Sequence, residues 1–258
     1  MFMGQVDLEL PGVLPLVLRR THFSEYRVGR WFGRSWASSV DIRIEVEDDA
    51  VYFADEDGAR LRYPLPPADG KPVFAVAGPR WPLVRQAEGY QLTRPEQQQI
   101  LTFPDSTARV RPIAAIADRN GNRIEFDYDA TGAPTLIRHS GGYRIAVDTE
   151  KGLVTGLRLT MDGGQGITLV GYRYNERGQL TEVVNSSNRA MRFDYDFSGR
   201  ITRWRDRNGE WYQYEYDGNG RVVRTEGSGN ALTGSCFAII HAFTGYGFAA
   251  STFSRNLR

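Results

Sequence analysis

The sequence predicts an all-β protein in which a small N-terminal β domain leads into stacked antiparallel β-hairpins that form part of a curved, spiralling sheet. Glycine or proline interrupts almost every long stretch, and no window keeps apolar residues at helical spacing for more than about two turns. Apolar and polar residues alternate instead, as in the run from Ile42 to Val46, which is typical of half-buried strands. In the second half of the chain, units of hairpin length repeat.

The charge of the chain is nearly balanced. Its 258 residues include 32 Lys and Arg against 31 Asp and Glu, which gives a net charge of +1. No bulk field therefore favours a polyanion, and the sequence predicts no nucleic-acid partner. The single cysteine, Cys236, excludes an intramolecular disulfide and a multi-thiolate metal site. The longest uncharged apolar run near the start, residues 13–18, is too short for the core of a signal peptide. No Sec-type signal peptide is visible in the sequence.

Residues 1–112 are expected to form the N-terminal β domain. Acidic clusters at 47–49 and 55–58 separate its alternating runs, and we interpret them as hairpin turns because their spacing does not fit a calcium-binding loop. The cluster at 118–122 is interpreted in the same way. The proline-rich stretch at 64–104 is expected to hold only short edge strands and loops, since proline cannot donate to a central ladder.

From residue 113 to 229 the sequence repeats itself. Tyr174, Tyr195 and Tyr216 are spaced by 21 residues, and three glycines keep the same spacing. With an earlier copy at Tyr128 and a degenerate one spanning 147–153, about five units are detectable. The residues assigned to the repeat are Tyr128, Asp129, Gly132, Tyr174, Gly178, Tyr195, Asp196, Gly199, Arg200, Tyr216, Asp217, Gly220 and Arg221.

Each unit predicts one hairpin. The aspartate after the tyrosine can close an Asx turn on its own backbone, and the glycine three residues later can adopt the positive φ that ends the turn. The tyrosines are interpreted as scaffold, because stacked hairpins bury what a lone hairpin cannot. The alternative interpretation is a row of exposed aromatic side chains, Tyr195, Trp211 and Tyr216, that binds carbohydrate alongside neighbouring arginines.

The motif Tyr195-Asp196-x-x-Gly199-Arg200 and its copies resemble the YD repeat of the Rhs family, which includes bacterial polymorphic toxins. The segment from Asp7 to Arg20, followed by Gly33 and Trp36, resembles the domain that precedes those repeats. This resemblance implies a β-sheet cocoon around a C-terminal toxin that is absent from this chain, used in interbacterial competition. It also implies a cytoplasmic protein before delivery, secretion by a non-Sec route such as type VI secretion, and a secretion spike or adaptor as partner.

Residues 230–258 form an atypical tail. They contain no Asp or Glu and no Tyr-Asp-x-x-Gly unit. Our hypothesis is that the gene or its reading frame was interrupted near Leu232, so that the chain is a truncated fragment; the competing hypothesis is a small effector in the tail. An open fragment should expose unpaired strand edges, so poor solubility or oligomers are expected.

No catalytic residue, cofactor or metal site is expected. The three histidines, His22, His139 and His241, are scattered, and the glycine-rich stretch from Asp162 to Gly166 has no phosphate-loop context and predicts a hairpin tip. The carboxylates are expected in solvated turns, where they stay ionised. The sequence therefore predicts a non-catalytic N-terminal fragment of a toxin shell whose further partners are the remaining repeats and the toxin; the alternative is a module that binds cell-surface glycans.

Overall fold

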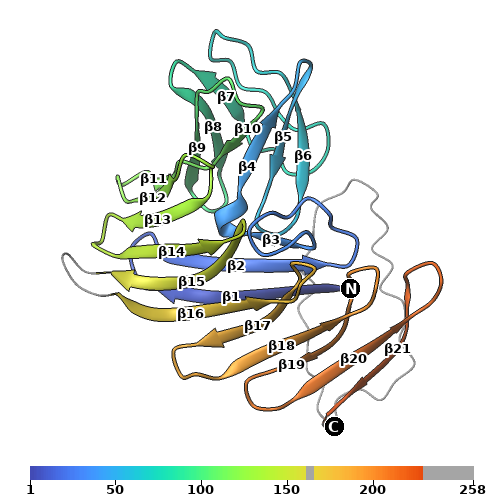
Figure 1. Ribbon diagram of the computed structural model, residues 1–258. Helices are drawn as coiled ribbons and strands as arrows, with labels where there is room; N and C mark the ends of the chain where they lie inside the picture. The colour runs from blue at the N-terminus through green and yellow to red at the C-terminus, as the bar shows by residue number, and fades with distance from the viewer. Residues whose placement is uncertain (161–165, 229–258) are drawn as a thin grey trace, which may run out of the picture.

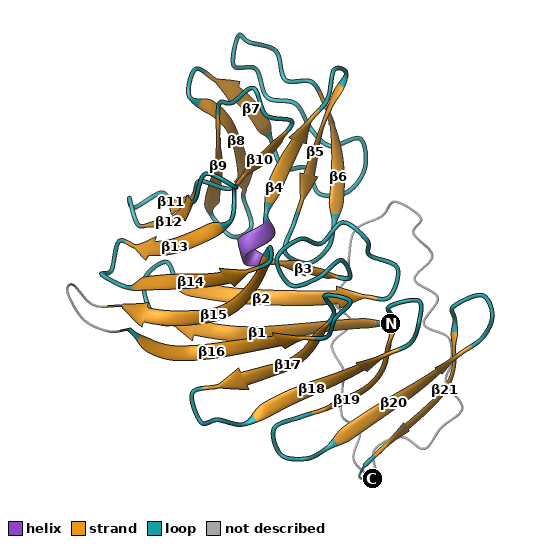
Figure 2. Ribbon diagram, viewed as in Figure 1, coloured by secondary structure: helices purple, strands orange, loops and turns teal. Residues whose placement is uncertain are grey.

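The computed structural model describes residues 1–160 and 166–228, which form three antiparallel sheets and one short 3₁₀ turn (Figures 1 and 2). The predicted all-β class and the open antiparallel sheet are confirmed. Predictions for residues 230–258, which include Cys236 and His241, and for the hairpin tip at Asp162 lie outside the described residues.

Two small sheets come mainly from the first part of the chain. One has the order β1-β2-β3 and the other the order β10-β4-β5-β6. Their elements are β1 (Phe2–Leu10), β2 (Leu16–Phe23), β3 (Trp36–Ser38), η1 (Ser39–Asp41), β4 (Arg43–Val46), β5 (Ala50–Ala54), β6 (Arg60–Pro64) and β10 (Val110–Pro112).

The third sheet has 14 strands that, apart from the omission of β10, follow one another in chain order. Every neighbouring pair is antiparallel, so hairpin follows hairpin along the sheet. The strands are β7 (Leu83–Gln86), β8 (Gly89–Arg94), β9 (Gln99–Pro104), β11 (Ala115–Asp118), β12 (Arg123–Tyr128), β13 (Pro134–His139), β14 (Arg144–Glu150), β15 (Leu153–Thr160), β16 (Ile167–Tyr174), β17 (Leu180–Asn185), β18 (Ala190–Tyr195), β19 (Ile201–Arg205), β20 (Trp211–Tyr216) and β21 (Val222–Gly227).

One face of the large sheet carries the core, and the small sheets cover it. Burial alternates along the central strands, with Ile137, Ile145 and Val183 completely buried. In Figure 1, β1 and β2 run across the large sheet at the level of β14–β16, and β4–β6 face β7–β9. The Phe53 ring in β5 packs against the Phe103 ring in β9, with 6.2 Å between the ring centres. The small sheets and the large sheet thus share one continuous core.

The large sheet starts earlier in the chain than the repeats do. Strands β7–β9 precede residue 113, the start of the predicted repeat region, yet they continue the same ladder of hydrogen bonds. The expectation that residues 64–104 hold only edge strands and loops is wrong for β8 and β9, each of which pairs on both sides. Pro82 lies just before β7 and Pro95 just after β8, both outside the strands, where no ladder donor is needed. The stretch 65–82 is irregular, as expected.

The degenerate unit at 147–153 forms a hairpin with a different turn. Lys151 (φ 51°) and Gly152 (φ 75°) make a two-residue turn between β14 and β15. Asp148 lies within β14 opposite Gly156 and forms an ion pair with Arg158 at 2.7 Å. The repeat pattern therefore predicted this hairpin, but it placed Asp148 at the turn, whereas Asp148 lies within β14.

Candidate functional site: the seam between the sheets

The repeat aspartates close the hairpin turns by hydrogen bonds to their own backbone. The Oδ1 atom of Asp196 accepts from the amides of Ser198 (2.9 Å) and Arg200 (2.9 Å), and Gly199 follows with a φ of 79°. Asp129, Asn175 and Asp217 make the same contacts in their turns. A backbone φ in this region favours glycine, which explains the glycine at the fourth position of each turn.

Each repeat tyrosine follows a β-bulge, and its hydroxyl bonds to backbone earlier in the chain. The register shifts immediately before Tyr128, Tyr174, Tyr195 and Tyr216. A bulge turns a side chain out of the regular alternation, and here each hydroxyl donates to a backbone carbonyl earlier in the chain. The pairs are Tyr128 with Ile113 (2.8 Å), Tyr174 with Val154 (2.6 Å), Tyr195 with Leu180 (2.7 Å) and Tyr216 with Ile201 (2.7 Å).

Two of these tyrosines also meet the N-terminal segment. The Tyr195 hydroxyl accepts a hydrogen bond from the indole Nε1 of Trp36 (3.1 Å), and the Tyr174 hydroxyl lies 3.4 Å from the carbonyl oxygen of Trp31. Trp36 is only 1% exposed and packs edge-on against Phe193 in β18. Burial raises the pKa of the Tyr195 hydroxyl, so it stays protonated and available as a donor.

A buried ion pair fastens the β1-β2 hairpin to the large sheet. Arg20 is only 1% exposed and donates hydrogen bonds to both carboxylate oxygens of Asp7. The distance from Arg20 Nη2 to Asp7 Oδ1 is 2.8 Å. The Tyr172 hydroxyl in β16 donates to Asp7 Oδ2 at 2.8 Å. The guanidinium also lies 4.7 Å from the centre of the Trp36 ring. We call these contacts, together with the Trp36–Tyr195 bond, the seam.

His22 lies inside the seam without a polar partner. It is fully buried, its ring is 5.1 Å from that of Trp36, and neither ring nitrogen has a hydrogen-bond partner among the described residues. Burial lowers the pKa of His22 from 6.5 to about 3, and the positive charges of the N-terminus and Arg27 add to the effect. The ring is therefore neutral at pH 7.

His139 serves a different contact. Its Nε2 lies 2.6 Å from the carbonyl oxygen of Leu14, and its Nδ1 accepts from the amide of Gly141 at 2.8 Å. The imidazole thus ties the loop between β1 and β2 to the turn after β13. The structure places the two histidines apart, in packing roles.

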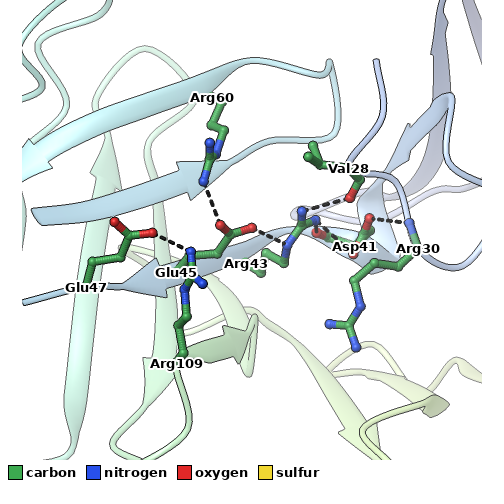
Figure 3. A network of polar contacts seen from close by, with 8 residues as sticks. All are labelled: Val28, Arg30, Asp41, Arg43, Glu45, Glu47, Arg60 and Arg109. Carbon is green, nitrogen blue, oxygen red and sulfur yellow. Dashed lines mark hydrogen bonds and ion pairs between the residues drawn. The ribbon is translucent and has the colours of Figure 1, made fainter. Parts of the chain in front are cut away.

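A second buried polar network holds β4 beneath the loop from Val28 to Arg30 (Figure 3). Arg43 pairs with Asp41 (3.0 Å) and Glu45 (3.2 Å), and it donates to the carbonyl of Val28 at 2.9 Å. Burial raises the pKa of Asp41 to about 6, against the opposing influence of the Arg43 and Arg30 charges.

The expectation that carboxylates lie in solvated turns is wrong at three positions. Asp7, Asp41 and Asp55 are buried, each beside an arginine: Arg20, Arg43 and Arg94, respectively. The strand pattern offered a signal for one of them, because Leu16, Leu18, Arg20 and His22 occupy the same face of β2. Alternation alone places Arg20 inside, and a buried guanidinium requires a carboxylate partner.

The three aromatics considered for carbohydrate binding lie in different surroundings. The hydroxyls of Tyr195 and Tyr216 are engaged with backbone carbonyls, and Tyr195 is covered by the seam. Trp211 pairs with Arg205 across β19 and β20, with the Arg203 guanidinium 4.7 Å from its ring centre. All three side chains are half-buried, and their proposed role in carbohydrate binding stays a prediction.

The described residues contain neither a cluster of metal ligands nor a membrane-spanning helix. No group of three His, Cys, Asp or Glu side chains there is placed to hold a metal ion. Among the same residues, no helix is long and apolar enough to cross a membrane.

Comparison with known families agrees with the repeat geometry. The family described as Teneurin YD-shell matches residues 87–252, more than half of the chain, and a domain of unknown function (DUF6531) matches residues 1–63. This chain belongs to the Rhs/YD-repeat family. The YD-shell match runs past Gly229, so the boundary expected there stays a prediction.

Curated relatives of this YD-repeat chain are much longer proteins. It is 30% identical over 207 residues to the "Probable deoxyribonuclease RhsA" of Dickeya dadantii (strain 3937), covering 79% of this chain and 14% of the relative. It is 26% identical over 195 residues to the "Double-stranded DNA deaminase toxin A" of Burkholderia cenocepacia (strain H111), covering 73% of this chain and 13% of the relative. The chain thus spans about one-seventh of the curated relatives it matches.

Solved structures of Tc toxins also align with the YD-repeat chain. A Tc holotoxin pore from Photorhabdus luminescens aligns with a TM-score of 0.40 and 12% identity, over 89% of this chain and 15% of that chain. The TcdB2-TccC3 complex aligns with a TM-score of 0.38 and 14% identity, over 84% and 11% of the respective chains.

Proposed function

We propose that this chain is a non-catalytic part of a YD-repeat shell that encloses a toxin carried elsewhere in the same polypeptide. The observation that carries the proposal is the hydroxyl-to-carbonyl bond that recurs at Tyr128, Tyr174, Tyr195 and Tyr216. Each bond links one hairpin to earlier backbone, so the residues that define the motif are used to build the wall. A phenol that donates its only proton to the backbone has no donor left for a substrate or ligand.

The relatives support a shell part and a toxin part that are separate regions of one polypeptide. Two are named as probable deoxyribonucleases and one as a DNA deaminase toxin, and this chain aligns with only 13–14% of their lengths. The matched part carries the shell family. We therefore assign the named activities to the other parts of those proteins, and a wall function to the part represented here.

The setting of this function is part of the proposal. By its family, the shell would be made in the bacterial cytoplasm, leave by a non-Sec route such as type VI secretion, and act in competition between bacteria. Its partners would be the remaining repeats, the enclosed toxin and a spike or adaptor protein of the secretion machine. A wall of this kind protects the producing cell because it holds the toxin apart from its substrate.

The non-catalytic assignment can be tested directly on the purified chain. We expect no cleavage and no deamination when the chain is incubated with double-stranded DNA and Mg²⁺. Turnover that persists through repeated purification and disappears on substitution of a single side chain would overturn the assignment.

The wall assignment predicts a shared pattern of backbone protection. Amides of β12–β18 should exchange slowly with deuterium and open together, because each hairpin is bonded to its neighbours on both sides. Independent, rapid exchange of single hairpins would contradict a continuous wall.

The alternative, a glycan-binding face made of Tyr195, Trp211 and Tyr216, has less support. The two tyrosine hydroxyls are engaged internally, and all three side chains are half-buried. Glycan binding that is lost in Trp211→Ala, with the fold retained, would restore this alternative.

A further inference from the structure

Two arginines of β19 lie on the face of the large sheet that is opposite the core. Phe193 in β18 is buried in the core, and Trp204 in β19 is its direct cross-strand partner, so Trp204 shares that face. Successive side chains of a strand point to opposite faces. Arg203 and Arg205, on either side of Trp204, therefore point away from the small sheets (Figure 1).

A continuous surface surrounds these two arginines. In the register of the sheet, Arg205 lies between Arg192 of β18 and Trp211 of β20. The guanidinium of Arg203 lies over the Trp211 ring, 4.7 Å from its centre. Arg205 is exposed, and Arg203 and Trp211 are half-buried. We call the four side chains Arg192, Arg203, Arg205 and Trp211 the arginine patch.

The charges of the arginine patch are only partly matched within the chain. Arg192 and Arg205 are directly opposed, and like charges at such positions destabilise a sheet. Glu182 pairs with Arg192 at 2.7 Å. In contrast, neither Arg203 nor Arg205 forms an ion pair within the described part of the chain.

Arg203 also has an unmet hydrogen-bonding group. Its Nε is shielded from solvent and has no acceptor among the described residues. A polar group that loses water without gaining a partner is costly. An anion at the arginine patch would supply that acceptor and would reduce the repulsion between Arg192 and Arg205, so binding of an anion is favoured.

The spacing of the charges specifies the form of the anion. Two residues apart in a strand, the Arg203 and Arg205 side chains leave the same face about 7 Å from each other. An extended peptide has the same repeat, so carboxylates at its alternate positions can meet these two guanidiniums in turn. Arginine binds carboxylates in a fork geometry, and tryptophan and arginine are the residues that most often dominate protein interfaces.

We propose that the arginine patch docks an extended acidic segment of a partner protein. Carboxylates at alternate positions of the segment pair with Arg203 and Arg205, and the methylene groups of one glutamate pack on the Trp211 ring. The proposal is independent of the shell function, because the arginine patch lies on the face opposite the core and uses none of the tyrosine bonds.

Single-stranded nucleic acid fits the arginine patch less well. Three carboxylates border the patch: Asp194, opposite Arg203 in the register, Glu210, which precedes Trp211, and Glu226 in β21. A nucleic acid carries a charge at every nucleotide and is repelled by these groups, whereas a peptide can place uncharged residues beside them. The net charge of +1 also gives no long-range attraction for a polyanion.

The test is a fluorescence-anisotropy titration of labelled peptides with the full chain. In the first peptide three glutamates alternate with serines, in the second the same glutamates are contiguous, and in the third glutamines replace them. Labelled decathymidylate is a separate arm. We expect saturable binding of the alternating acidic peptide, weaker binding of the contiguous peptide and of decathymidylate, and no binding of the glutamine peptide.

Variants of the chain locate the binding. Arg203→Gln and Arg205→Gln should each weaken binding of the alternating peptide about fivefold, because each removes one ion pair. Arg205→Lys keeps the charge and should bind more tightly than Arg205→Gln. The matched control is Arg224→Gln on the same face, where the arginine already faces Glu215 at 3.6 Å, and it should leave the affinity unchanged. Thermal unfolding of each variant checks that the fold is retained.

Several outcomes would overturn the proposal. These are no saturable binding of the alternating peptide, equal binding of the glutamine peptide or of the contiguous peptide, equal effects of Arg205→Gln and Arg224→Gln, or tighter binding of decathymidylate. Each of these results would leave the shell function untouched, whereas failure of the wall in hydrogen exchange would leave the peptide result standing.

Discussion

The hydroxyl of Tyr195 donates a 2.7 Å hydrogen bond to the backbone carbonyl of Leu180, fifteen residues earlier in the chain. Tyr216 repeats the relationship with Ile201, and Tyr128 with Ile113, at the same separation. At positions 195 and 216 the tyrosine that names the repeat therefore bonds one hairpin to the hairpin before it. Its position depends on the bulge before it, since regular alternation would aim the ring elsewhere.

Removing the Tyr195 hydroxyl should destabilise the chain more than removing that of Tyr216. Tyr195→Phe loses the bond to Leu180 and leaves the buried Trp36 indole without its acceptor, whereas Tyr216→Phe loses one bond. We expect losses in the free energy of unfolding of about 2–3 and about 1 kcal/mol, respectively. Urea denaturation measures both, with Tyr143→Phe as the control. Equal losses at 195 and 216 would contradict the Trp36 contact.

Breaking the buried ion pair should detach the N-terminal hairpin. Asp7→Leu leaves Arg20 buried without its carboxylate, and we expect a loss of about 3–5 kcal/mol. The double variant Asp7→Leu/Arg20→Met should recover most of that loss, because no charge then stays unpaired in the core. Asp49→Leu, which breaks an exposed pair with Arg62, should change stability by less than about 1 kcal/mol. A double variant as unstable as Asp7→Leu would show that the pair does more than compensate buried charge.

The repeat hairpins could be predicted from sequence because their information is local. The positions of the turn aspartate and its glycine lie within four residues, and both are dictated by backbone geometry. Strand alternation likewise predicts which side chains of β13 and β14 point inward. The same local rules predicted a hairpin at 147–153 but not its turn. That turn consists of Lys151 and Gly152, which both have a positive φ.

The seam could not be predicted from local patterns. The bond from Trp36 to Tyr195 joins residues 159 positions apart, and that from Tyr172 to Asp7 joins residues 165 apart. No spacing rule relates such residues, and the partner of a buried arginine can be any carboxylate that the fold brings near.

His22 should make the chain less stable in acid. Its folded pKa of about 3 lies below its ordinary value of 6.5, so the unfolded chain binds the proton more readily between these two values. Stability is therefore complete above about pH 6.5 and falls with decreasing pH, by up to about 1.4 kcal/mol per pH unit. His22→Leu should remove this component, which is measured as the difference between the two stability curves from pH 7 to pH 4. Parallel curves would contradict the burial of a neutral imidazole.

The positive φ of the turn glycine can be tested at Gly132, where an added Cβ would meet no atom within 4 Å. Gly132→Ala should cost about 1 kcal/mol, entirely from backbone conformation. Gly132→Asn should cost less, since Asn188 adopts a φ of 56° in the corresponding turn position. Thermal unfolding ranks the three chains, and an alanine variant as stable as the parent would contradict the assigned turn.

The central claim, that the repeat tyrosines bond to backbone earlier in the chain, is tested most directly by nuclear magnetic resonance of their hydroxyl protons. If the bonds exist as described, the hydroxyl protons of Tyr128, Tyr195 and Tyr216 are observable at neutral pH and exchange slowly with water, while that of Tyr143 exchanges too fast to detect. Rapid exchange at all four positions would contradict the claim.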